Sequence, residues 1–177
     1  MESTAAILLR RTKYSDTSLI VTWLTRDHGK LQTIARGALR PKSPFVGVLD
    51  LFFETEIAFV RSRRSALHTL REAGLICPFE GLRRDYARVE LAAYFVELLE
   101  LMVEPEHPVP ELFELLHRAL AYLENAAPSR RALLHFENEL ARLLGIHHGV
   151  GSAATALTRV CHRLPAARGK LLGKYEV

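Results

Sequence analysis

The sequence predicts an α+β protein in which an all-β module precedes a helical bundle. Residues 1–80 contain five short runs rich in apolar, β-branched and aromatic residues, a composition typical of strands. Near residues 78–81 the apolar period lengthens to that of helices. We therefore expect two domains, an all-β domain at 1–80 and a helical domain at 81–177.

The all-β module is expected to be a small closed barrel. Its strands are predicted at residues 5–13, 18–26, 30–35, 49–60 and 67–76, with a tight turn at 27–29. In the fourth strand, Leu49, Leu51, Phe53, Ile57 and Phe59 alternate with Asp50, Glu54 and Glu56, which predicts one buried and one solvent face. Five such strands favour a five-stranded oligonucleotide/oligosaccharide-binding (OB) fold, and an SH3-like barrel is the alternative.

The helical module is expected to contain four helices. They are predicted at residues 82–103, 111–124, 130–144 and 152–164, and the first is apolar around most of its circumference, as a central helix is. Pro110, Ser129 and Ser152 suit helix beginnings, and Gly145 suits a helix end. Residues 168–177 lack a strong pattern, so we expect a flexible basic tail there.

Composition and charge bound the class of protein. The 177 residues are 49% hydrophobic and 25% charged, as in ordinary globular proteins. The net charge of +4 belongs to residues 1–80, which hold 12 Lys and Arg against 8 Asp and Glu, whereas residues 81–177 hold 12 of each. Two distant cysteines and the lack of a long apolar run favour a cytoplasmic protein without a membrane partner.

Residues 29–47 concentrate positive charge on a strand and the loop that follows it. The stretch contains no acid and no catalytic motif. Several fixed cations suit a phosphate backbone, because each contact releases counterions. A second basic loop at 61–64 and the arginines of the first strand add to this charge. The residues expected to bind nucleic acid are Arg10, Lys30, Arg36, Arg40, Lys42, Arg61, Arg63 and Arg64; a merely solvated loop is the alternative.

Aromatic side chains on the same module are candidates for stacking on the bases of a single strand. The module offers Tyr14, Trp23, Phe45, Phe52 and Phe53. Most of them are expected to pack inside the barrel. Phe45 lies in the basic loop and is the best candidate for an exposed platform.

Metal binding and catalysis receive little support. His147, His148, Cys161 and His162 form a set that zinc favours, but adjacent His147 and His148 are badly placed to bind one ion. A polar loop after a helix end is the alternative. The chain has no phosphate-cradling glycine loop, nucleophile elbow or paired-acid motif. We expect no metal, no cofactor and no enzymatic activity.

Several segments resemble the RecO family of recombination mediators. They are residues 6–18 (AILLRRTKYSDTS), 21–30 (VTWLTRDHGK) and, most closely, 35–43 (ARGALRPKS). The likeness continues to about residue 145. It implies an OB fold followed by a helical domain, and it assigns the DNA contacts of the family's basic loop to Arg36, Arg40 and Lys42.

The resemblance also implies a function in recombinational repair of DNA damage. Proteins of this family bind single- and double-stranded DNA, anneal complementary strands, bind the acidic tail of single-stranded-DNA-binding protein, and act with RecR to help load RecA. For this chain it implies a cytoplasmic, nucleoid-associated protein. An acidic tail needs an apolar pocket with basic residues at its rim, for which Arg130, Arg131 and Arg142 are the candidates.

Two departures from the family and two rival functions stay open. The four-cysteine zinc motif of many members is absent after Gly145, and the chain is shorter than usual. An annealing-only, DNA-binding form is therefore one alternative. The others are a protein-interaction module without annealing activity and an enzyme acting on nucleic acid.

Overall fold

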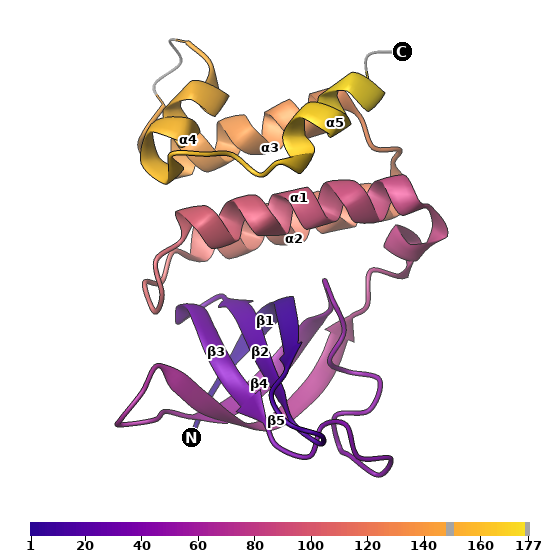
Figure 1. Cartoon of the computed structure of the whole chain (residues 1–177), viewed down its shortest axis with the longest axis vertical. Coiled ribbons are helices and arrows are strands. Elements are labelled where there is room, and N and C mark those ends of the chain that lie inside the picture. The colour runs from indigo at the N-terminus through magenta and orange to yellow at the C-terminus, as the bar shows by residue number, and fades with distance from the viewer. Residues whose placement is uncertain (148–150, 176–177) are drawn as a thin grey trace. The chain divides into compact units, whose positions relative to one another are not determined.

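The computed structural model describes residues 1–147 and 151–175 and contains two compact units (Figure 1). The first comprises Met1–Pro78 and Glu104–Phe113, and the second comprises Phe79–Val103 and Glu114–Val177. The segment Glu104–Phe113, which the sequence pattern grouped with the helices, packs with the strands. Its Pro105 bridges Lys30, and the Glu106 amide donates to the Lys30 carbonyl at 2.8 Å.

The first unit contains a closed five-stranded barrel. Its strands are β1 (Glu2–Lys13), β2 (Leu19–Thr25), β3 (Gly29–Ala35), β4 (Glu54–Val60) and β5 (Leu67–Cys77). They close in the order β1-β2-β3-β5-β4, with β3 and β5 parallel and every other neighbouring pair antiparallel. The expected OB-type barrel is thereby confirmed.

Apolar side chains from all five strands fill the barrel. Trp23 is fully buried, and its indole N–H donates to the Thr33 hydroxyl at 2.9 Å, so this large side chain leaves no unsatisfied donor. Leu8, Ile57 and Phe59 pack in the same core. A fully packed interior fixes the strands and therefore the positions of the loops between them.

The expectation for residues 49–60 was wrong in its first half. The strand begins only at Glu54, after a turn in which Phe52 has a φ of 69°. This turn and the bulge beside Glu54 shift the alternation, so Glu54 is buried and Leu51 is exposed. Glu54 therefore does not belong to the predicted solvent face.

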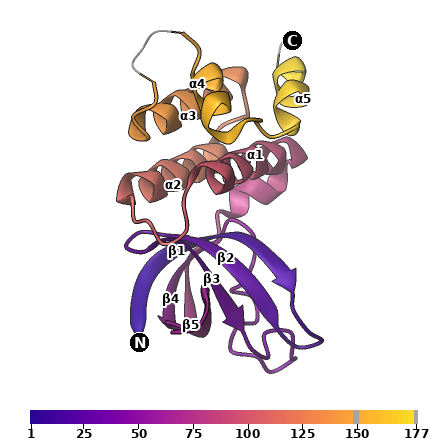
Figure 2. The same ribbon diagram turned by 60° about the vertical axis from the view of Figure 1, so that its left-hand side comes forward.

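The second unit is helical. Its elements are a 3-10 turn (Glu80–Arg84), α1 (Tyr86–Met102), α2 (Pro110–Asn125, whose first turn belongs to the barrel unit), α3 (Arg130–Leu143), α4 (Ala153–Cys161) and α5 (Ala167–Lys174). In this unit α1 and α2 form one layer, and α3, α4 and α5 form the other (Figure 2). The expected continuous helix at 82–103 is interrupted because Asp85 is extended and caps α1, accepting from the Ala87 amide at 3.0 Å.

The expected flexible tail is also wrong for the residues that the structure describes. Helix α5 occupies Ala167–Lys174, with Leu171 buried. Arg168 binds both carboxylate oxygens of Glu137 at 2.6 and 2.9 Å. Lys170 and Lys174 each bind Glu90, at 2.9 and 2.7 Å. The basic residues of this segment thus attach a helix to α3 and α1.

Candidate nucleic-acid interface

The strand register brings basic residues from two segments to one end of the barrel. Lys13, the last residue of β1, pairs with Leu19 of β2, and Leu19 pairs with Ala35, the last residue of β3. Neighbouring strands lie about 4.8 Å apart, so the Lys13 and Ala35 backbones are roughly 10 Å apart. Arg36 follows Ala35 directly, which places Lys13 and Arg36 at the same end of the barrel.

The loop between β3 and β4 is ordered by successive turns. Three backbone hydrogen bonds define these turns. The amides of Arg40, Ser43 and Val46 each donate to the carbonyl three residues earlier, at 3.0, 3.0 and 3.3 Å. Two further bonds join the loop to the turn between β1 and β2: the Leu39 amide donates to the Thr17 carbonyl at 3.0 Å, and the Gly37 amide donates to the Ser18 hydroxyl at 3.3 Å. The loop therefore has a fixed shape.

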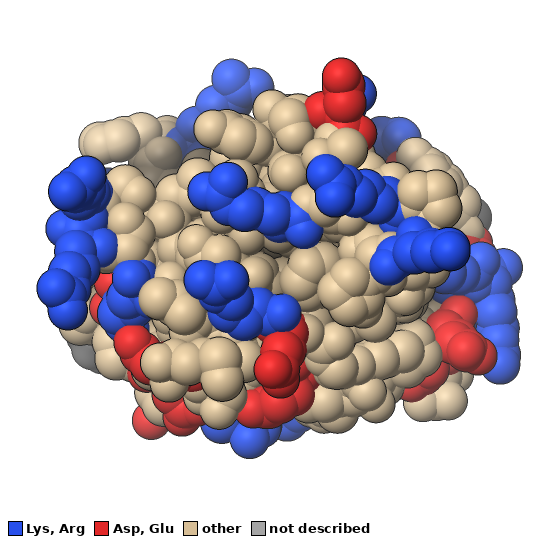
Figure 3. Space-filling model, turned by 90° about the horizontal axis from the view of Figure 1, so that it is seen from below, with Lys and Arg blue, Asp and Glu red and all other residues tan. Residues whose placement is uncertain are grey.

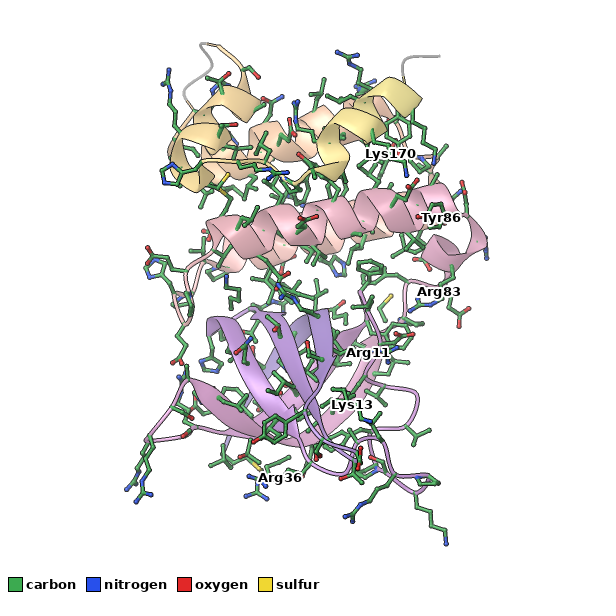
Figure 4. The ribbon with its side chains drawn as sticks, in the orientation of Figure 1. Arg11, Lys13, Arg36, Arg83, Tyr86 and Lys170 are labelled. Carbon is green, nitrogen blue, oxygen red and sulfur yellow. The ribbon has the colours of Figure 1, made fainter. Side chains whose placement is uncertain are left out.

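Three of the expected DNA-binding residues lie on this loop. Arg36, Arg40 and Lys42 are all exposed, and no acid occurs between residues 36 and 48. Within the described part of the chain, none of the three forms an ion pair with a carboxylate. Figure 3 shows the molecule from below the view of Figure 1, with Lys and Arg side chains spread over the face that is seen. Figure 4 labels Arg11, Lys13 and Arg36 in the barrel unit.

The remaining expected residues do not join this loop. Lys30 is the second residue of β3 and lies six residues before Arg36, which separates their backbones by about 20 Å along the strand. Arg63 and Arg64 are exposed in the loop between β4 and β5. Arg10 is exposed on β1, opposite Thr22 of β2. The structure thus divides the predicted set between the loop at 36–42 and a second basic loop at 61–64, and it leaves Arg10 and Lys30 on strands outside both loops.

Arg61 is committed to contacts within the barrel unit. Its guanidinium donates to Glu2 at 2.8 and 3.1 Å and to Glu106 at 2.6 Å. Burial lowers the pKa of Arg61, but the hydrogen bonds and charges of the two carboxylates outweigh this and raise it. A phosphate at Arg61 has to compete with two acids, whereas one at Arg36 does not.

The expectation for Phe45 was wrong. The loop folds back so that Phe45 joins the barrel core with Ala38 and Leu49. Trp23 and Phe52 are buried as well, and Phe53 is half-buried. Tyr14, in the turn after β1, is 60% exposed.

The sequence pattern overlooked Lys13 at the end of β1, although its place at a hairpin end beside a basic loop was a usable signal.

A second feature is a pocket of about 710 Å³ in the helical unit. Its lining comes from α1, α2 and α3: Phe95, Leu115, Arg118, Ala119, Tyr122, Arg131, Ala132, His135, Phe136 and Glu139. Of the three arginines expected to receive an acidic tail, only Arg131 lines the pocket. Arg142 is drawn to Glu139 at 2.9 Å, and Arg130 is exposed at the start of α3.

The pocket is apolar with basic groups in its lining. Hydrogen bonds from Arg142 lower the pKa of Glu139 despite partial burial, and His135 and Arg118 add to this effect. The negative charge of Glu139 is therefore balanced mainly by Arg142, which does not line the pocket. Arg118 was missed by the sequence pattern, although its neighbours Leu115, Ala119 and Tyr122 at helical spacing indicated an apolar stripe beside it.

No metal site is found among residues 1–147 and 151–175, where no three His, Cys, Asp or Glu side chains gather suitably for one ion. His147, Cys161 and His162 belong to these residues, and His148 lies outside them. Cys77 and Cys161 are free thiols. Among the described helices, none has the length and apolarity that crossing a bilayer requires.

Comparison with known proteins agrees with the barrel-then-helices arrangement. The family model for "Recombination protein O N terminal" matches residues 1–79, and the model for "Recombination protein O C terminal" matches residues 83–147. The two matched segments correspond closely to the strands and to the first three helices.

Individual relatives lead to the same family. The DNA repair protein RecO of Rhodopirellula baltica is 37% identical over 158 residues, covering 89% of this chain and 57% of the relative. Those of Syntrophus aciditrophicus and Salinibacter ruber are 38% and 37% identical, covering 80% and 81% of this chain and 55% of each relative. The chain thus spans little more than half the length of these relatives. Together, the two family-model matches and these identities show that the chain belongs to the RecO family.

Proposed function

We propose that this protein acts in DNA repair by binding single- and double-stranded DNA through its barrel and by annealing complementary strands. The observation that carries the proposal is the ordered loop with three exposed, acid-free cations, Arg36, Arg40 and Lys42. Because the backbone of the loop is held in place, phosphate binding need not order it, and only side-chain conformational entropy is lost. The name shared by the relatives, DNA repair protein RecO, supports the same function.

Annealing requires no covalent chemistry. Two strands repel through their phosphates, and a surface that neutralises both raises their local concentration and lowers the barrier to pairing. Exposed cations in two separate loops, at 36–42 and 63–64, suit this task. We therefore propose a non-enzymatic mediator, with the protein-interaction module as the alternative.

The test of the proposed function is the annealing rate of two complementary oligonucleotides that carry a fluorescent donor and acceptor. The wild-type protein should accelerate annealing, and the Arg36→Ala/Arg40→Ala variant should lose about tenfold or more of this acceleration, because two phosphate contacts are removed. Arg159→Ala, which changes an exposed arginine of α4, is the matched control. Equal rates for the wild type and the double variant would refute the assignment.

We propose that the pocket of α1, α2 and α3 receives the acidic tail of single-stranded-DNA-binding protein. Arg118 and Arg131 supply the charge, and Phe95, Leu115 and Phe136 supply an apolar floor. Such a pocket suits a peptide that combines carboxylates with an apolar end. Binding there would bring the protein to DNA covered by that partner; cooperation with RecR and RecA is proposed on the family relationship alone.

The tail pocket is tested by fluorescence titration with a labelled acidic peptide that ends in apolar residues. Arg131→Ala and Arg118→Ala should each weaken binding by about tenfold, the usual effect of losing a charge-assisted hydrogen bond. Arg159→Ala should bind as the wild type does. Unchanged affinity in both pocket variants would exclude the pocket as the binding site.

A further inference from the structure

Tyr14 is unusual among the aromatic residues of the barrel unit. Its side chain is 60% exposed, whereas Trp23, Phe45, Phe52, Phe59 and Phe113 are all buried. The structure describes every residue of this unit, and Tyr14 is the one exposed Phe, Tyr or Trp within it. An exposed tyrosine alone is ordinary, so its surroundings decide whether it has a role.

The backbone around Tyr14 is fixed. The amides of Tyr14 and Ser15 both donate to the Ser18 carbonyl, at 2.9 and 3.3 Å, which closes a tight turn between β1 and β2. The same turn holds the basic loop through the bonds from Leu39 to Thr17 and from Gly37 to Ser18. Tyr14 is therefore presented on a rigid support shared with Arg36 and Arg40.

Two cations lie near Tyr14 along the backbone. Lys13 precedes it, and the register places the backbone of Ala35, the residue before Arg36, about 10 Å from that of Lys13 at the same end of the barrel. Lys13 pairs with the fully exposed Asp16 at 3.2 Å, and a phosphate readily replaces such an exposed pair. An exposed aromatic side chain close to basic residues is the arrangement by which proteins hold single-stranded nucleic acid.

We infer that Tyr14 is a stacking platform for a base of single-stranded DNA, with Lys13 and Arg36 contacting the flanking phosphates. The inference rests on the proposed DNA binding and adds a source of strand preference to it. Bases in a duplex already stack on their neighbours, so only a single strand offers a free face to Tyr14. The phosphate contacts contribute to binding of both single- and double-stranded DNA, whereas Tyr14 contributes to binding of single-stranded DNA alone.

The experiment compares the affinity of wild-type, Tyr14→Leu and Tyr14→Phe proteins for three ligands at one salt concentration. The ligands are an oligothymidylate, an abasic single strand of equal length and a duplex of equal length. The affinity of Tyr14→Leu for the oligothymidylate should be lower than that of the wild type by about fivefold or more. Its affinities for the other two ligands should stay within about twofold of the wild type, which is about the experimental error. Tyr14→Phe keeps the aromatic face and should bind all three as the wild type does.

The outcomes separate the two proposals. A wild-type protein that binds none of the ligands refutes the proposed function. A wild type that binds DNA, with Tyr14→Leu binding the oligothymidylate equally well, refutes the stacking inference alone. Equal weakening on the oligothymidylate and the abasic strand also refutes it, because the effect then does not involve a base.

Two controls protect this comparison. Tyr86→Leu changes a tyrosine of α1 that is 71% exposed and lies outside the barrel unit, and it should leave all three affinities unchanged. The salt dependence should keep its slope in Tyr14→Leu, because no phosphate contact is lost. A slope reduced as in a lysine or arginine variant would assign Tyr14 to a phosphate and overturn the inference.

Discussion

Gly29 shows how one residue fixes the path of a distant segment. It has a φ of 68°, and a β-carbon added there would overlap the carbonyl group of His107. Both residues belong to the barrel unit. Glycine is therefore required twice, for the turn and for the close approach of Glu104–Phe113.

Replacing Gly29 by Ala should destabilise the protein by about 2 kcal/mol or more, because the left-handed backbone and the overlap add. The measurement is the urea midpoint followed by circular dichroism. Gly74→Ala is the control, since Gly74 has no positive φ and its added β-carbon meets nothing within 4 Å. Similar midpoints for the two variants would contradict this explanation.

Glu137 is the other residue on which much depends. It is 1% exposed, accepts a hydrogen bond from the Tyr94 hydroxyl and forms a two-point ion pair with Arg168. Burial and the bond to Glu137 raise the pKa of Tyr94, so the phenol remains protonated as the donor. Removing the charge of Glu137 leaves Arg168 without its counterion.

Glu137→Gln should therefore lower the free energy of unfolding by about 3 kcal/mol, whereas Tyr94→Phe should lower it by about 1–3 kcal/mol. Glu139→Gln on the same helix is the matched control. Its partner Arg142 is 60% exposed, so solvent screens this ion pair more than that of Glu137, and the loss should stay below about 1 kcal/mol. Equal losses for the two glutamates would show that burial does not set the strength of these pairs.

At the scale of elements, α5 depends on contacts that no local pattern reveals. Arg168 meets Glu137 across 31 residues, and Lys170 and Lys174 meet Glu90 across 80 and 84 residues. A run of basic residues without strong periodicity therefore resembled a tail. The strands were easier to predict, because alternation and turn residues are local signals. The exception is Glu54, which is buried because the turn at Phe52 shifts the alternation of buried and exposed residues.

The contacts of Glu90 make the attachment of α5 sensitive to pH. Hydrogen bonds from Lys174 and Lys170 lower the pKa of Glu90 below its ordinary value of 4.5, against the effect of burial. A lowered folded-state pKa contributes stability above the unfolded-state value, and this contribution disappears as the pH falls through the folded-state value.

The wild type should accordingly exceed Glu90→Gln in stability at neutral pH, and the difference should shrink as the pH falls below about 4.5. Urea unfolding of both proteins across this range measures it. Glu97→Gln, on the exposed face of α1, serves as the control and should show a smaller change. A difference that stays constant with pH would contradict the role of Glu90.

At the scale of the whole molecule, the sequence predicted the barrel and the first three helices well. It also predicted DNA contacts on the loop at 36–42, because charge without acids is visible in the sequence, and these contacts remain a prediction. It misplaced Phe45, whose burial depends on how that loop folds over the barrel. The division into a DNA-binding domain at 1–80 and a helical domain at 81–177 remains a prediction about independent behaviour.

The central claim is that the exposed cations of the loop at 36–42 bind phosphates, and the salt dependence of single-stranded DNA binding tests it most directly. The logarithm of the binding constant should fall linearly with the logarithm of salt concentration. For Arg36→Ala/Arg40→Ala the slope should be smaller than in the wild type by about 1.4, which is about 0.7 for each lost contact. Arg159→Ala should keep the wild-type slope. A double variant with the wild-type slope, or a wild type that does not bind at low salt, would contradict the claim.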